Sequence, residues 1–115
     1  MARQLIQSQE ITITSGTTTA AINLDNRVLV GVDIPSGVAS TTMTIEAAPT
    51  SAGTFDKVYD GLGQYGAVGN VTFTIAASKQ IIIPPQITAG VMVCKLAFGS
   101  SETAKTYTIY TREIE

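Results

Sequence analysis

The side chains in this sequence best suited to acid–base chemistry are four carboxylates, Asp33, Glu46, Asp56 and Asp60. Two of them facing each other across a cleft could hydrolyse a glycosidic bond, which requires an acid together with a base or nucleophile. Their positions along the expected strands do not converge. The sequence also has no histidine, the commonest general base, and no G-x-S-x-G nucleophile motif. We therefore expect no catalytic residues and no enzymatic activity.

A metal site is the second kind of chemistry to consider. Asp56 and Asp60 are followed by Gly61 and Gly63, and carboxylates with nearby backbone carbonyls are ligands that calcium prefers. The segment lacks the alternating Asp/Asn ligands and the bidentate glutamate of a calcium loop. An Asp-Gly pair is also what a tight turn prefers. The sequence therefore predicts a turn, with no metal and no cofactor.

Aromatic contact with a ligand is a third possibility, centred on the glycine-rich loop at residues 60–70. Phe55 and Tyr59 lie at even spacing on an expected strand, which is typical of side chains that fill a core. Tyr65 follows Gln64 and precedes a glycine, and we expect it to be exposed.

The last predicted strand carries two further tyrosines. Tyr107 and Tyr110 fall on its opposite faces, so one of them must leave the core. An outward tyrosine on a threonine-rich strand is suited to anchoring an interface. The candidate residues for contact with a partner or ligand are therefore Gln64, Tyr65 and Tyr110.

Residues 80–98 are the segment around which the other elements are expected to pack, because they hold the densest apolar run and the only Pro-Pro pair. A short isoleucine strand ends at Pro84, since proline has no N–H for a strand ladder. A second strand is expected over residues 91–98. Its inward face is predicted to consist of Met92, Cys94, Leu96 and Phe98. Only Lys95 interrupts the apolar character of the other face, and this pattern favours a central strand.

Most of the remaining chain alternates apolar and polar residues in period two, as strands do. Further strands are expected over residues 10–14, 17–24, 27–34, 41–47, 54–59, 71–76 and 105–113. Turns are expected at residues 15–16, 25–26, 35–37 and 99–103. No window supports a helix longer than a turn or two. The pattern predicts an all-β fold, a single antiparallel β-sandwich of about eight or nine strands of Greek-key or jelly-roll type.

The 115 residues suit one domain, 1–115, with residues 1–8 as a flexible N-terminal arm. The chain is 44% hydrophobic and 14% charged, which is apolar for a soluble domain of this size. Surplus apolar surface of this kind favours a homo-oligomer, with a trimer as the first expectation and a dimer as the second.

The charge pattern excludes several partners. The net charge is −2 and the seven basic residues are scattered, so we expect no nucleic-acid binding. No run approaches 18 apolar residues and the N-terminal residues do not form a secretory signal, which predicts no membrane association and synthesis in a cytoplasm. The single cysteine, Cys94, cannot form an intrachain disulfide and is expected to act as a small buried hydrophobe.

Two family resemblances emerge along residues 29–110. After Ile34-Pro35, the motifs TMTIEAAPTSAGTFDKVYDGLGQ and VTFTIAASKQIIIPPQITAGVMVCKLAFG resemble small β-sandwich virion proteins of tailed bacteriophages. The same arrangement of strands, glycine loop and Pro-Pro turn is also similar to discoidin-like and carbohydrate-binding jelly rolls.

The phage resemblance implies a decoration (cement) protein of the virion, which is assembled in the host cytoplasm and stabilises the shell by docking on the major capsid protein or another virion protein. The second resemblance implies a glycan-binding module of a phage tail or fibre appendage. The absence of tryptophan and the shortage of exposed aromatic residues count against sugar binding, which usually needs a stacking platform.

Overall fold

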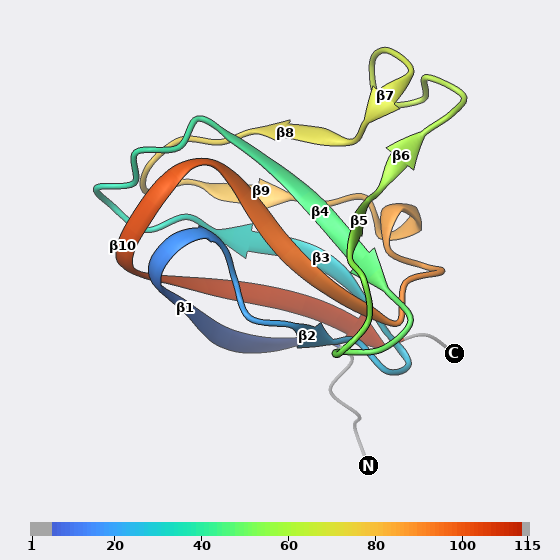
Figure 1. Ribbon diagram of the computed structural model, residues 1–115, viewed down its shortest axis with the longest axis horizontal. Coiled ribbons are helices and arrows are strands. Elements are labelled where there is room, and N and C mark those ends of the chain that lie inside the picture. Colours follow the sequence, from blue (N-terminus) through green and yellow to red (C-terminus); the bar gives the residue numbers. More distant parts are fainter. Residues whose placement is uncertain (1–5, 114–115) are drawn as a thin grey trace.

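The computed structural model describes residues 6–113, which form ten strands and one short helical turn (Figure 1). The strands are β1 (Ile6–Thr18), β2 (Ile22–Asn23), β3 (Arg27–Asp33), β4 (Thr42–Ala48), β5 (Asp56–Lys57), β6 (Tyr59–Asp60), β7 (Gly69–Asn70), β8 (Thr72–Thr74), β9 (Gln80–Ile82) and β10 (Val93–Glu113). The helical element is η1 (Pro85–Ile87), a single 3-10 turn. No helix within residues 6–113 is long and apolar enough to cross a membrane.

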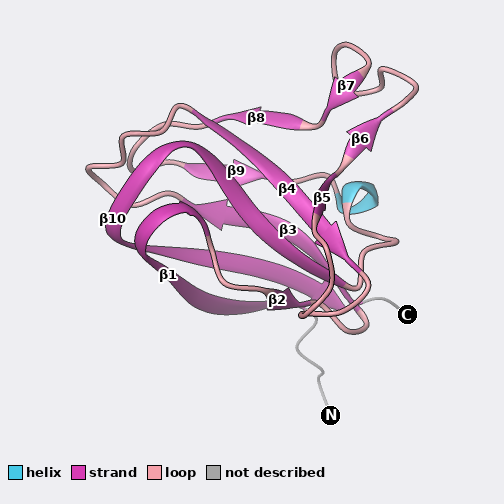
Figure 2. Cartoon of the chain, viewed as in Figure 1, coloured by secondary structure: helices cyan, strands magenta, loops and turns pink. Residues whose placement is uncertain are grey.

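Eight of these strands form one antiparallel sheet, with the order β5-β4-β10-β3-β9. β1 and β2 also pair with β10, β8 pairs with β4, and β6 and β7 form a separate two-stranded sheet. The cartoon in Figure 2 shows how completely strands dominate the structure. The predicted all-β antiparallel class is confirmed.

The long strand β10 connects the two layers of the fold. Its first part, residues 93–98, pairs with β4, whereas its last part, residues 108–113, pairs with β3. Between these parts β10 bends back on itself at the left of the view in Figure 1. The two layers are therefore parts of one curled sheet that encloses the core between them.

Two of the predicted turns are wrong, because the chain bends there within paired strands. Residues 15–16 and 99–103 were expected to reverse the chain, but both belong to long strands that pair with each other through Ser15 and Thr103, and through Gly16 and Glu102. Gly16 has φ +121°, which favours glycine, and the register shifts between Gly16 and Thr18. The paired strands keep their hydrogen bonds and bend together, so the glycine allows a bend instead of a hairpin turn.

Several predicted element boundaries change as well. β1 begins at Ile6, so residues 6–8 of the predicted arm are in a strand, where Ile6 pairs with Arg112. Residues 1–5 lie outside the described part of the chain. Of the strand expected over residues 17–24, residues 17–18 belong to β1 and residues 22–23 form β2. The strand expected over residues 54–59 divides into β5 and β6.

The inward face of residues 91–98 is largely as predicted. Cys94 and Leu96 are fully buried and Phe98 nearly so, but Met92 is 58% exposed because β10 begins only at Val93. The Phe98 ring stacks on the buried Tyr107 ring with centroids 4.7 Å apart. The strand is central as expected, because β4 pairs with one of its edges and β2 with the other.

Candidate interaction site at the β6–β7 hairpin

The β6–β7 hairpin projects from the curled sheet as a separate lobe (Figure 1). Tyr59 pairs with Asn70 and Asp60 with Gly69, and the loop between the two strands contains three glycines. The Val71 N–H donates to Val58 O and closes the base of the hairpin, and the Val58 N–H donates to Ile45 O of β4 and joins this base to the body.

The carboxylate of Asp60 organises this loop. Its Oδ1 accepts the N–H groups of Leu62 at 3.1 Å and Gly63 at 2.9 Å, and its Oδ2 accepts the N–H of Tyr65 at 2.8 Å. The hydrogen bond from Tyr65, joined by those from neighbouring N–H groups, lowers the pKa of Asp60 despite the opposing effect of burial. Gly63 has φ +74°, which a glycine adopts without strain. Asp60 therefore performs the turn chemistry that the sequence predicts.

Removal of divalent metal should leave the thermal stability of the protein unchanged, because both oxygens of Asp60 already accept hydrogen bonds from backbone N–H groups. Within residues 6–113, no cluster of three histidine, cysteine, aspartate or glutamate side chains could hold a metal ion. We expect the same melting temperature with and without EDTA in a thermal unfolding experiment. A decrease of several degrees with EDTA, reversed by added calcium, would contradict the turn assignment.

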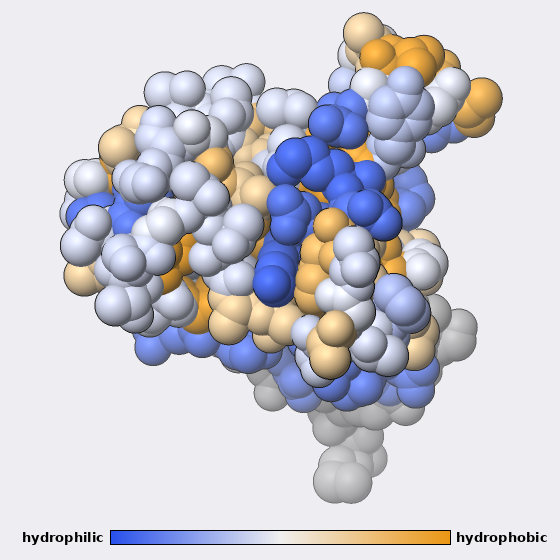
Figure 3. Space-filling model, in the orientation of Figure 1, coloured by the Kyte–Doolittle hydropathy of each residue, from blue (hydrophilic) through white to orange (hydrophobic). Residues whose placement is uncertain are grey.

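The outer surface of the hairpin is unusually apolar. Of the seven large hydrophobic side chains exposed among the described residues, four lie here: Tyr59 at 63%, Leu62 at 82%, Tyr65 at 37% and Val68 at 58%. No charged residue occurs in residues 61–70. Figure 3 shows orange patches on the projecting lobe among paler residues. We call the four side chains Tyr59, Leu62, Tyr65 and Val68 the hairpin knob.

A groove of about 300 Å³ lies where the hairpin meets η1. Tyr59, Gln64 and Tyr65 line it from the hairpin, and Gln86 and Ile87 line it from η1. The structure thus brings together two of the three predicted contact residues, Gln64 and Tyr65. The groove combines aromatic rings and amides, with Asp60 as its only ionisable carboxylate.

The third predicted contact residue, Tyr110, lies on β10 and not at the hairpin. Its hydroxyl donates a 2.6 Å hydrogen bond to Asp33 Oδ2, and this bond raises the pKa of Tyr110. A Cβ placed on Gly31, the residue opposite Tyr110 on β3, would lie 3.5 Å from the tyrosine ring. Tyr110 and Tyr107 do point to opposite faces, and Tyr110 is partly buried and held in one orientation.

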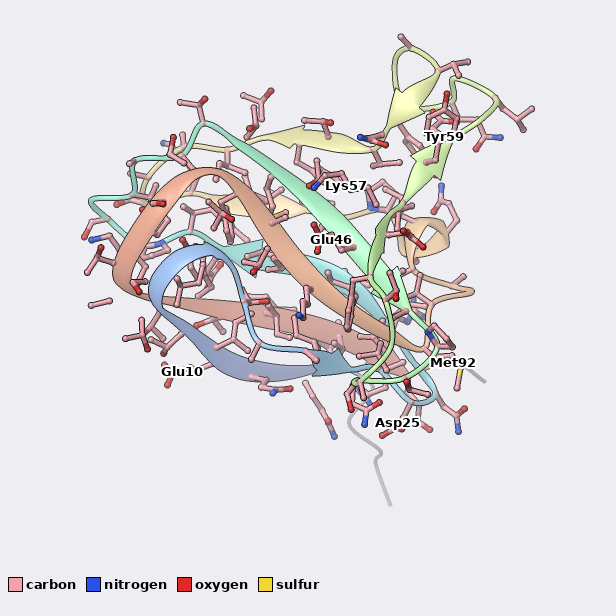
Figure 4. All side chains as sticks on the ribbon, viewed as in Figure 1. Glu10, Asp25, Glu46, Lys57, Tyr59 and Met92 are labelled. Atoms are coloured by element: carbon pink, nitrogen blue, oxygen red, sulfur yellow. The ribbon has the colours of Figure 1, made fainter. Side chains whose placement is uncertain are left out.

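The four carboxylates considered for catalysis are distributed over separate contacts. Asp33 accepts the hydrogen bond from Tyr110, and Asp60 holds the hairpin loop. Glu46 on β4 forms a 3.2 Å ion pair with Lys57 on β5, and Figure 4 labels both side chains on this face of the sheet. Asp56 lies on β5 opposite Ala47. Three of the four carboxylates thus have structural partners in three different places.

Tyr59, Leu62 and Val68 of the knob were not among the predicted contact residues. Tyr59 was expected in the core beside Phe55, but the strand breaks at Val58, and Tyr59 turns outward into the hairpin (Figure 4). Phe55 stays partly buried under Lys95, whose Nζ lies 4.4 Å from the ring centroid. The uncharged run at residues 61–70 is the sequence signal that could have identified Leu62 and Val68.

No protein-family model and no curated protein matches this chain. The resemblances noted over residues 29–110 stay predictions. The hairpin knob and its groove are the observations from which a function can be argued.

Proposed function

We propose that this chain is a structural virion protein of a tailed bacteriophage, which docks on the capsid as a decoration protein and stabilises the shell. Its partner is the major capsid protein or another virion protein, and it acts as a homo-oligomer after assembly in the host cytoplasm. The resemblance of the sequence motifs to phage virion proteins supports the virion role. The exposed apolar side chains of the hairpin knob support the proposed docking surface.

The exposed apolar surface of the knob is the observation that supports docking on a protein. Interface centres are depleted of charge and enriched in aromatic side chains, and the uncharged segment 61–70 with Tyr59 and Tyr65 has this composition. The knob projects from the sheet, so it can enter a depression on a shell without moving the body of the domain (Figure 1). Asp60 holds the loop in shape beforehand, which reduces the entropy lost on binding.

Substitution of Leu62 by lysine should weaken capsid binding by at least about tenfold, because a charge would enter the desolvated centre of the contact. Leu62 is 82% exposed, so the substitution should leave the fold intact. The measurement is co-sedimentation of the purified protein with expanded, undecorated capsids of the phage that encodes it, over a range of concentrations.

Met92→Lys is the matched control, since Met92 is another exposed apolar side chain, at 58%, outside the hairpin. It should bind capsids as the wild-type protein does. A wild-type protein that does not co-sediment with capsids would refute the decoration role. A Leu62→Lys variant that binds capsids as tightly as the wild-type protein would refute the knob as the docking surface.

The groove beside the knob favours a second candidate function, glycan binding by a tail or fibre module. Tyr59 and Tyr65 supply aromatic rings, and Gln64 and Gln86 supply amides that can hydrogen-bond to hydroxyl groups. A glycan array separates the two functions. Binding that is lost in Tyr65→Ala and Gln64→Ala, without any capsid binding, would favour the glycan module.

A further inference from the structure

The strand β9 ends one side of the main sheet. It pairs with β3 through Gly31, Val32 and Asp33, and with no other strand among those described. Its outer side chain Ile82 is 82% exposed, which equals the highest value for a large hydrophobic residue in residues 6–113. An exposed apolar edge of this kind is a template for pairing with another strand.

The hydrogen bonds to β3 show which backbone groups of β9 are unused by the sheet. Ile34 N–H donates to Lys79 O, and Ile83 N–H donates to Val30 O. In an antiparallel ladder the residues that bond to one neighbour alternate with those that face away from it. Residues 79, 81 and 83 therefore face β3, whereas the N–H and C=O groups of Gln80 and Ile82 point outward.

We propose that β9 is the interface between two copies of this chain, which pair their β9 strands antiparallel about a two-fold axis at Ile81. In this register Gln80 exchanges two backbone hydrogen bonds with the partner's Ile82, and Ile82 exchanges two with the partner's Gln80. The two outward residues thus satisfy one another completely. The curled sheet continues from one protomer into the next.

The side chains fit the same register. Ile81 lies opposite the partner's Ile81 in a non-hydrogen-bonded pair, the type in which cross-strand side chains come closest. In each protomer Ile81 already packs against the core. On the outer face, Ile82 lies diagonal to the partner's Ile82, within reach of contact. Each protomer therefore covers the exposed isoleucine of the other.

Charge favours a second copy as the occupant. Identical strands place identical side chains near each other, so a charged edge would repel its own copy. Residues 80–94 contain no charged side chain, whereas β5, at the opposite end of the strand order, consists of Asp56 and Lys57. Charged residues of that kind block edge pairing, and β9 lacks this protection. Pro84 limits the paired segment at its C-terminal side.

Sedimentation equilibrium on the full chain tests this interface. The wild-type protein should reach twice its 12.0 kDa mass at high micromolar concentration. Ile82→Lys should weaken dimerisation at least about tenfold, because two lysines would meet beside the axis. Ile82→Pro should do the same by removing an N–H that only the dimer uses. Circular dichroism should show that both variants stay folded.

Leu62→Lys is the control of equal exposure, and it should remain a dimer. Loss of capsid binding in Leu62→Lys with retention of the dimer separates this interface from the proposed docking surface. A wild-type protein of 12.0 kDa or of three times that mass would overturn the proposal. So would an Ile82→Lys variant that dimerises as strongly as the wild-type protein.

Discussion

Replacement of Glu102 by glutamine should lower the free energy of unfolding by roughly 2 to 3 kcal/mol, which corresponds to a decrease in melting temperature of roughly 10 °C. Glu102 is only 2% exposed, yet it carries a carboxylate into the bend of β10. Chemical denaturation of the two proteins at neutral pH measures the difference.

The size of this effect follows from the contacts of the carboxylate. Glu102 Oε1 accepts the Ala39 N–H at 3.0 Å, and Oε2 accepts the Ser40 N–H at 2.7 Å and the Ser40 hydroxyl at 2.5 Å. These donors lie on the segment that connects β3 to β4. The Ala39 N–H also reaches Oε2, at 3.1 Å. A glutamine whose oxygen takes the Oε2 position would still accept from Ala39 and Ser40, but it would set its NH₂ group against the Ala39 N–H and replace a charged acceptor with a neutral one. The carboxylate thus ties the bend of β10 to the neighbouring connection.

The same contacts predict a dependence on pH. Burial alone would raise the pKa of Glu102, but the Ser40 hydroxyl, the N–H groups of Ala39 and Ser40, and the charge of Lys105 bring this pKa below its usual value. The unfolded chain binds a proton at higher pH than the folded protein does. The contribution is therefore complete above the ordinary glutamate pKa of about 4.3 and is lost as pH falls through the folded value.

Ser40→Ala is the matched control. It removes the hydroxyl that donates to Glu102 and accepts the N–H of the exposed Ser100, and it leaves the Ala39 and Ser40 N–H groups paired with the carboxylate. It should therefore cost only about 1 kcal/mol. Glu102→Gln should also flatten the acid side of the stability profile, whereas Ser40→Ala should keep its slope with a smaller shift. A glutamine variant as stable as the wild-type protein at pH 7, with an unchanged acid profile, would contradict the role assigned to Glu102.

The sequence could predict the fold class because strand alternation is a local property. The alternation of Met43 and Ile45 on β4, for example, is visible in the sequence, and both side chains are fully buried. The path of the chain through residues 15–16 and 99–103 depends instead on pairing between segments more than eighty residues apart. A glycine permits both a turn and a bend, and only the partner strand decides between them.

In the candidate site, too, local sequence predicts some features, whereas others depend on contacts with distant segments. The exposure of Gln64 and Tyr65 follows from neighbouring glycine and polar residues, so the sequence could identify them. The outward turn of Tyr59 depends on the break at Val58, whose N–H bonds to Ile45 O and whose O accepts from Val71. Glu102 lies in a predicted turn, and nothing local indicates that distant N–H groups surround its carboxylate.

The thiol of Cys94 should react in the native protein at least about a thousandfold more slowly than in denaturant, because labelling must await opening of the domain. Cys94 is fully buried in β10 between Ala47 of β4 and Ile22 of β2. Burial raises its pKa to about 12, so little reactive thiolate exists at neutral pH. The measurement is the rate of modification by a chromogenic disulfide reagent with and without guanidinium chloride.

Two substitutions at adjacent positions test the face assignment that this slow reaction requires. Cys94→Ser buries a hydroxyl among apolar side chains and should cost about 1 to 3 kcal/mol of unfolding free energy. Lys95→Ser removes a partly exposed side chain that contacts the Phe55 ring and should cost less than about 1 kcal/mol. Equal costs, or native labelling as fast as in denaturant, would mean that Cys94 does not face the core. The assignment of Leu96 and Phe98 to the core face would then be wrong as well, because it depends on the same alternation.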